Sequence, residues 1–191
     1  RMNGFSHAFP NCLINIVSLS SPDDPKVGDA DCLVFDGQTP WRDSYSTTLV
    51  SGSYTVVASA SYTSNARSLS PRHLANSPLL GCNQTPDLWQ RWFSTAGLSE
   101  PPQESARFDD LAVLIEATLV GQGVALLPDF LIADDIRTGR LRRLFPDSTF
   151  GRIEYNLAVR PSHQRASVQA FVDWLDSPAC NRFSGQAVRT A

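Results

Sequence analysis

The stretch from Asp109 to Pro128 reads DDLAVLIEATLVGQGVALLP and carries the strongest structural signal in the chain. Asp109 predicts the N-cap of a helix, and Asp110 a favourable acid in its first turn. Apolar residues follow on two sides of that helix, so we expect it to be covered on both sides. Gly121 predicts the helix end, and VALLP at 124–128 is typical of a buried parallel strand. A helix followed by a strand excludes a dinucleotide fingerprint, which follows a strand and opens a helix.

The segments around this stretch predict an α/β sheet, because apolar runs of strand length alternate with helical patterns. A helix is expected around Phe5 and Phe9, and a second one, with Leu88, Trp92 and Phe93 on one face, is expected to end at Gly97. Further helices are expected at 71–76, at 129–139 with Asp129 as cap, and at 168–175. Strands are expected at 12–19, 30–37, 54–62, 78–82 and 153–161, and residues 140–147 are expected to form an edge strand or an extended exit.

Composition narrows the class of protein. With 191 residues, 42% hydrophobic and 18% charged, the chain is typical of globular proteins, and no apolar run approaches the roughly 18 residues of a membrane span. The start RMNGFSHAFP is not typical of a signal peptide, which favours the cytoplasm and no membrane contact. A net charge of -3 argues against a nucleic-acid surface on this chain.

Metal, cofactor and catalytic sites find little support in the sequence. No C-x-x-C pair is present, so we expect no metal and interpret the cysteines as buried reduced thiols: Cys12, Cys32, Cys82 and Cys180. Lys26 is the only lysine and lies in a polar turn, so a Walker nucleotide site and a Schiff base are improbable, and no cofactor is expected. The histidines are scattered and no G-x-S-x-G or H-E-x-x-H motif is present, so the chain is not expected to be an enzyme.

Five segments in order resemble one known family. They closely resemble the effector-binding domain of LysR-type transcriptional regulators. The runs that carry the resemblance are RFDDLAVLIEATLVGQGVALLPDFLIADDIRTGRLRRLFPD, then YNLAVRP and VQAFVDWLD. SHAFPNCLINI and GDADCLVFDG extend the resemblance, which covers roughly Phe5 to Leu175. The motif W-x-x-W-x-x-x-x-G in DLWQRWFSTAGL is similar to the branch of glycine-cleavage activators and β-lactamase regulators.

The resemblance implies an α/β, two-lobed, type II periplasmic-binding-protein-like fold, N-terminally truncated here. Lobe I would combine residues 1–61 with 152–191, and lobe II would be residues 62–151. A small-molecule effector would bind between the lobes, and a homodimer is expected, with a tetramer open for the full-length protein. The family's winged helix-turn-helix is absent from this chain, so DNA would be bound only through that missing domain.

Candidate site residues follow from the strand ends, the helix N-terminus and the resemblance together. The expected ligand contacts are Asn83, Gln84, Thr85, Phe108, Asp109, Asp110, Leu127, Pro128 and Tyr155. The resemblance places the dimer interface on the helix that contains Leu114, Glu116 and Thr118. An extracytoplasmic solute-binding protein of the same fold remains the alternative.

Overall fold

The chain folds into two compact units. The computed structural model describes residues 2–19, 24–37, 41, 44–63, 70–98, 103–160 and 165–177. Unit 1 comprises Arg1–Ser51 with Glu154–Ala191, and unit 2 is Gly52–Ile153. Two strands, β2 (Tyr45–Ser59) and β7 (Phe150–Val159), each run through a boundary between the units.

Unit 2 is built on a mixed sheet. Its strand order is β2-β5-β3-β4, and β6 pairs with β2; the bounds are β3 Leu79–Cys82, β4 Ala106–Phe108, β5 Val124–Pro128 and β6 Leu141–Arg143. β3 runs parallel to both β4 and β5, whereas β2 is antiparallel to β5 and β6. The carboxyl ends of β3, β4 and β5 therefore meet at one edge of the sheet, where loops and helix N-termini commonly form binding sites.

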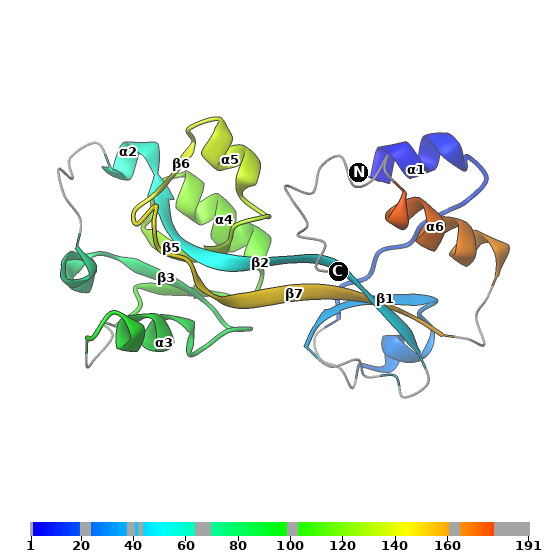
Figure 1. The fold of residues 1–191 in the computed structure, drawn as a ribbon, viewed down its shortest axis with the longest axis horizontal. Coiled ribbons are helices and arrows are strands. Elements are labelled where there is room, and N and C mark those ends of the chain that lie inside the picture. The colour runs from blue at the N-terminus through cyan, green and yellow to red at the C-terminus, as the bar shows by residue number, and fades with distance from the viewer. Residues whose placement is uncertain are drawn as a thin grey trace. The chain divides into compact units, whose positions relative to one another are not determined.

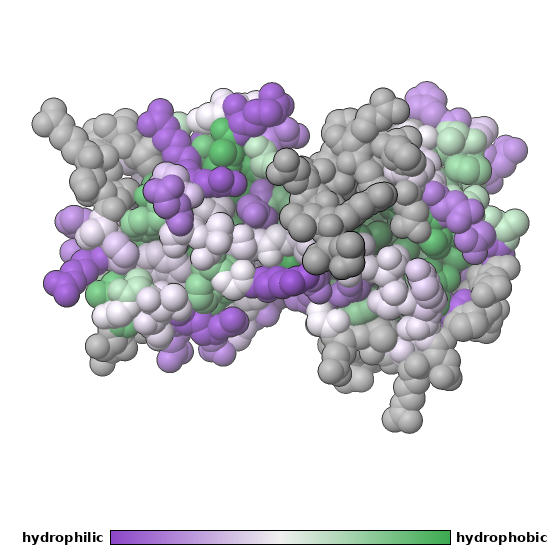
Figure 2. Space-filling model, in the orientation of Figure 1, coloured by the Kyte–Doolittle hydropathy of each residue, from purple (hydrophilic) through white to green (hydrophobic). Residues whose placement is uncertain are grey.

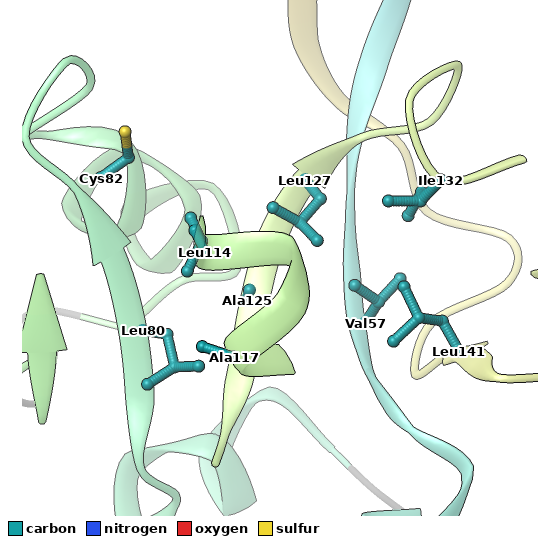
Figure 3. Close-up of a cluster of buried hydrophobic side chains, with 9 residues drawn as sticks. All are labelled: Val57, Leu80, Cys82, Leu114, Ala117, Ala125, Leu127, Ile132 and Leu141. Atoms are coloured by element: carbon teal, nitrogen blue, oxygen red, sulfur yellow. The ribbon is translucent and has the colours of Figure 1, made fainter. Parts of the chain in front are cut away.

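Helices cover both faces of this sheet. Figure 1 shows α4 (Leu111–Leu119) and α5 (Ala133–Arg137) on one face and α3 (Leu88–Thr95) on the other. The shorter elements of unit 2 are α2 (Ala60–Thr63) and a 3₁₀ helix at Pro71–Asn76. Figure 3 shows Leu114 and Ala117 of α4 among buried side chains of the strands. These contacts make one apolar core beneath α4 and α5.

The stretch from Asp109 to Pro128 folds largely as predicted, with two corrections. β5 is buried along its length, and Gly121, which follows the helix, has φ +84°. The helix begins at Leu111, and Asp110 rather than Asp109 is the N-cap, because the Asp110 carboxylate accepts a 2.7 Å hydrogen bond from Ala112 N. The expectation of cover on both sides is also wrong for the chain by itself, since Val113 and Val120 are exposed.

Unit 1 contains α1 (Met2–Ala8), a 3₁₀ helix (Pro25–Gly28), β1 (Cys32–Asp36) and α6 (Ala166–Asp176). β1 pairs with β7 in antiparallel register. Phe5 is fully buried, and its ring centroid lies 5.3 Å from that of Phe171 and 5.5 Å from that of Trp174. The aromatic side chains thus join α1 to α6, which also lie side by side in Figure 1.

The strand predicted at residues 12–19 does not form. Residues 13–19 have no regular structure, and Leu13, Ile16 and Val17 are exposed. A strand requires a neighbour for its backbone groups, and none of the described residues pairs with this segment. β2 begins earlier than the strand predicted at 54–62, at Tyr45, and it ends at Ser59, because residues 60–62 belong to α2. The predicted tail after Cys180 lies outside the described residues.

The surface over α4 and α5 is mainly hydrophilic. In Figure 2 hydrophilic residues surround a small hydrophobic area there. Arg137 lies 3.2 Å from Asp134, and Arg140 is paired with Asp135. Two arginines of the basic run at 137–143 are therefore balanced by neighbouring acids on a solvated face.

Candidate functional site

The candidate site lies at the carboxyl edge of the strands in unit 2, where three predicted residues are hydrogen-bonded together. The Asn83 side chain donates from Nδ2 to Asp109 Oδ1 at 2.6 Å. The Gln84 side chain donates from Nε2 to the Asp109 carbonyl at 3.3 Å. Both amides follow β3 and Asp109 follows β4, so the parallel pairing of these strands brings the three residues together. All three are exposed, so they are available to a ligand.

The turns around this cluster hold it in place. Asn83 N donates to Phe108 O at 2.9 Å, which extends the β3–β4 ladder by one bond beyond Cys82. Thr85 N donates to Cys82 O at 3.1 Å and closes the turn that presents the two amides. Asp110 then begins α4, so the N-terminal end of that helix and its positive partial charge lie beside Asp109.

Leu127 and Pro128 form the end of β5 at the same edge. Both are buried, and Leu127 contributes to the core beneath α4. They can form an apolar floor but offer little surface to a ligand. Asp129, predicted as a helix cap, does not have that role, because α5 begins at Ala133 with Ile132 at its N-cap position.

Asp129 instead joins β5 to β2. Its Oδ1 accepts from Ser53 N at 3.3 Å, its Oδ2 lies 3.4 Å from Ser53 Oγ, and its own N donates to Ser53 O at 2.9 Å. A Cβ at Gly52 would collide with the Asp129 carboxylate, so a larger residue there would have to displace this side chain. Sequence reasoning missed Ser53 because it is separated from Asp129 by 76 residues. The only local signal was an aspartate that directly follows a buried strand.

The remaining predicted residues lie elsewhere. Tyr155 is half-buried on β7 in unit 1, in register with Asp36 of β1. Leu114 and Thr118 are buried against the sheet of unit 2, and Thr118 Oγ1 donates to Leu114 O at 2.7 Å. These two side chains therefore have no surface to offer a second chain in this conformation. Glu116 is exposed, and the outer side of α4 that it shares with Val113 and Val120 is the part of the predicted interface that a partner could contact.

The chemistry of this cluster is hydrogen bonding. Two amides, one carboxylate and a helix N-terminus can orient a small polar ligand. Among the described residues no group of three or more His, Cys, Asp or Glu side chains could hold a metal ion. Burial and the nearby Asp31 raise the pKa of the Cys32 thiol to about 11, which disfavours a thiolate nucleophile at that position.

Comparison with known proteins gives a consistent family. The sequence pattern of the LysR substrate binding domain matches residues 1–178. An uncharacterized HTH-type transcriptional regulator of Sinorhizobium fredii, y4mQ, is 33% identical over 111 residues, which cover 56% of this chain and 37% of that protein. The glycine cleavage system transcriptional activator of Escherichia coli is 26% identical over 178 residues, which cover 92% of this chain and 58% of that protein. The chain thus spans about two fifths to three fifths of the length of these relatives.

Solved structures agree on the fold. The effector domain of the transcriptional regulator AmpR of Pseudomonas aeruginosa superposes with a TM-score of 0.74 and 24% identity, covering 92% of this chain and 84% of that domain. The predicted α/β, type II periplasmic-binding-protein-like fold class is confirmed by this likeness, and the resemblance noted from the sequence is confirmed as well. No described helix has both the length and the apolarity needed to cross a membrane.

Proposed function

The chain belongs to the LysR substrate binding domain family, and on that premise we propose that it binds a small-molecule effector for a transcriptional regulator. The effector site is the cluster at the carboxyl edge of unit 2: Asn83, Gln84, Thr85, Phe108, Asp109 and Asp110, with Leu127 and Pro128 as its floor. Tyr155 on unit 1 stays a predicted ligand contact. The alternative of an extracytoplasmic solute-binding protein is not favoured, because the relatives found are regulators.

One observation carries this proposal. The Asn83 and Gln84 amides both converge on Asp109, at the point where β3 and β4 end and α4 begins. A ligand that replaced either hydrogen bond would meet a donor, an acceptor and a helix N-terminus within one small area.

The proposed mechanism is a shift between conformations. An effector that binds one arrangement of the protein more tightly than another shifts the equilibrium by its differential affinity. Lobe I at residues 1–61 and 152–191 and lobe II at 62–151 would be the parts that respond. The chain passes from one compact unit to the other between residues 51 and 52 and between residues 153 and 154. This division into two units supports a response that involves two parts of the chain. A DNA-binding domain elsewhere in the full-length protein would report the shift.

We also propose a homodimer that uses the outer side of α4. Val113, Glu116 and Val120 are exposed there, and two valines on one solvent-facing side of a helix suit a protein contact. Val120→Glu should reduce the dimer fraction in light scattering at micromolar concentration. Leu131→Glu, at an exposed apolar residue outside α4, is the matched control. A wild-type chain that is monomeric throughout this range would refute the interface for this chain.

A sensing role without catalysis, in the cytoplasm where DNA is found, completes the proposal. The transcriptional regulators among the relatives support this role. The neutral and acidic side chains of the cluster disfavour a highly anionic effector. The regulator's DNA contacts and any tetramer belong to the full-length protein.

The test begins with a thermal-shift screen of individual metabolites against the chain. A compound at a hundred times its dissociation constant should add about 2.7 kcal/mol of apparent stability. Binding should shift the side-chain amide signals of Asn83 and Gln84 in ¹H–¹⁵N spectra. Asp109→Ala should weaken it about tenfold or more, because a charged hydrogen-bonding partner is lost.

Asp147→Ala removes an exposed acid elsewhere in unit 2 and is the control. Tyr155→Phe tests the contact from unit 1 in the same titration. If a compound bound with unchanged affinity to Asp109→Ala and left both amide signals in place, the assignment of this cluster would be wrong.

A further inference from the structure

A pocket lies in unit 2 on side chains other than those of the proposed effector site, although Pro86 and Arg107 of its lining adjoin Thr85 and Phe108 in the sequence. Its volume is about 590 Å³, within the roughly 300–1,000 Å³ range of small-molecule sites. The polar and aromatic residues that line it are Trp89, Gln90, Gln103, Glu104, Ser105 and Arg107. None of the lining residues belongs to the cluster around Asn83 and Asp109.

The pocket is on the α3 face of the sheet. Ala106 and Phe108 pack against the core beneath α4, so Arg107 between them points to the opposite face, because side chains alternate along a strand. Trp89 of α3 is buried on that face and donates from Nε1 to Leu80 O at 2.9 Å. One wall of the pocket is therefore fixed by a buried hydrogen bond.

Two opposite charges lie side by side in this pocket. Arg107 Nη2 donates to Glu104 Oε1 at 2.9 Å and to Pro86 O at 2.8 Å. The Glu104 side chain is only 13% exposed, and Arg107 is 39% exposed. A Cβ at Gly81 would collide with the Glu104 carboxylate, so a glycine on β3 leaves the space that this carboxylate occupies.

This ion pair leaves hydrogen-bonding capacity unused. Glu104 Oε2 is buried and has no hydrogen-bond partner, an arrangement that costs free energy. Burial accordingly raises the pKa of Glu104, and the nearby Arg107 lowers it again in part. Arg107 uses only Nη2 toward the described residues, so its Nε and Nη1 remain as donors. Glu104 Oε2 lies against Gly81 of β3, and the broad terminal torsion of a glutamate allows the carboxylate to rotate toward the pocket.

We propose that this pocket is a second ligand site, for a zwitterion of the amino-acid type, whose carboxylate binds Arg107 and whose ammonium binds Glu104. The two side chains sum to zero charge, as such a ligand does. A purely anionic or cationic ligand would satisfy one group and repel the other. The side-chain amides of Gln90 and Gln103 supply neutral donors and acceptors for the rest of the molecule.

Each standard L-amino acid, titrated singly by calorimetry up to about 10 mM, is the probe. At least one should bind the wild-type chain, and its carboxamide and N-acetyl derivatives, which each lack one charge, should bind about tenfold more weakly or worse. Arg107→Gln and Glu104→Gln should each produce a loss of similar size. Arg137→Gln is the matched control, because Arg137 forms the same i, i+3 pair with Asp134 on the open surface and should leave binding unchanged.

A measurement on the wild-type chain keeps the proposal testable if a variant folds poorly. In ¹H–¹⁵N spectra the bound amino acid should shift the side-chain amides of Gln90 and Gln103 and leave those of Asn83 and Gln84 in place. The absence of binding by every amino acid would overturn the second site. Shifts confined to Asn83 and Gln84 would also overturn it, while placing the amino acid in the proposed effector site and leaving that proposal standing.

Discussion

Residues 12–19, CLINIVSL, and residues 124–128, VALLP, are both short runs of apolar, strand-forming side chains, yet only the second is a strand. β5 has a neighbour on each edge, β2 on one side and β3 on the other. It also has α4 packed against one face. Residues 13–19 pair with no strand among the described residues, and Ile16 is 75% exposed, although Leu19 at the end of the run packs against the core of unit 1. Apolar composition therefore marks a segment that can be buried, whereas its neighbours decide whether it is.

The largest loss in the free energy of unfolding is expected when a buried side chain of β5 is shortened. Leu127 is fully buried in the core beneath α4. Leu127→Ala should lower the free energy of unfolding by about 2–5 kcal/mol, because the lost transfer energy and the cavity both count. Urea denaturation measures it. A loss below about 1 kcal/mol would show that this core collapses around the cavity or is looser than the structure indicates.

The turn that leads into β5 is the next most sensitive place. A Cβ at Gly123 would collide with the carbonyl oxygen of Pro78 and lie 3.0 Å from Leu80 Cγ. Gly123→Ala should cost about 1–3 kcal/mol, because the backbone at Pro78, just before β3, and at Gly123, just before β5, must move apart. At Gly28 a Cβ would meet nothing within 4 Å. Gly28→Ala is therefore the control and should stay within about 0.5 kcal/mol of wild type; equal losses in the two variants would remove close packing as the cause.

The helix that precedes β5 offers a smaller effect at its cap. Asp110 accepts the hydrogen bond from Ala112 N, so Asp110→Ala should cost about 0.5–2 kcal/mol in the same denaturation experiment. Asp110→Asn should retain most of the stability, since asparagine is also a good cap. A larger loss from Asp109→Ala than from Asp110→Ala would contradict this cap and restore the one predicted from the sequence.

These cases show which features the sequence could predict. The helix, Gly121 and β5 follow one another along the chain, so their pattern is local and predicted them well. The amides at 83–84 and Asp109 were predicted from the strand ends and the helix N-terminus as ligand contacts of one lobe. Their hydrogen bonds to one another depend on the pairing of β3 with β4, a strand that was not predicted, and their role as ligand contacts stays a prediction. The hydrogen bonds between Ser53 and Asp129 could not be predicted in this way, because no local pattern records which distant strand a residue faces. The strand predicted at residues 12–19 was wrong for the same reason.

The smallest expected effect is at that unpaired run. Ile16→Ser should change the free energy of unfolding by less than about 0.5 kcal/mol, because an exposed side chain has almost no burial to lose. A loss above about 1 kcal/mol would mean that Ile16 is buried in solution. Repeating the measurement over a range of protein concentrations would then show whether a second chain or another part of the same chain buries it. A loss that grows with concentration requires a second chain, since association stabilises by mass action, whereas a constant loss means that the same chain buries it. Unchanged stability at every concentration would leave neighbours, rather than composition, as the difference between residues 12–19 and β5.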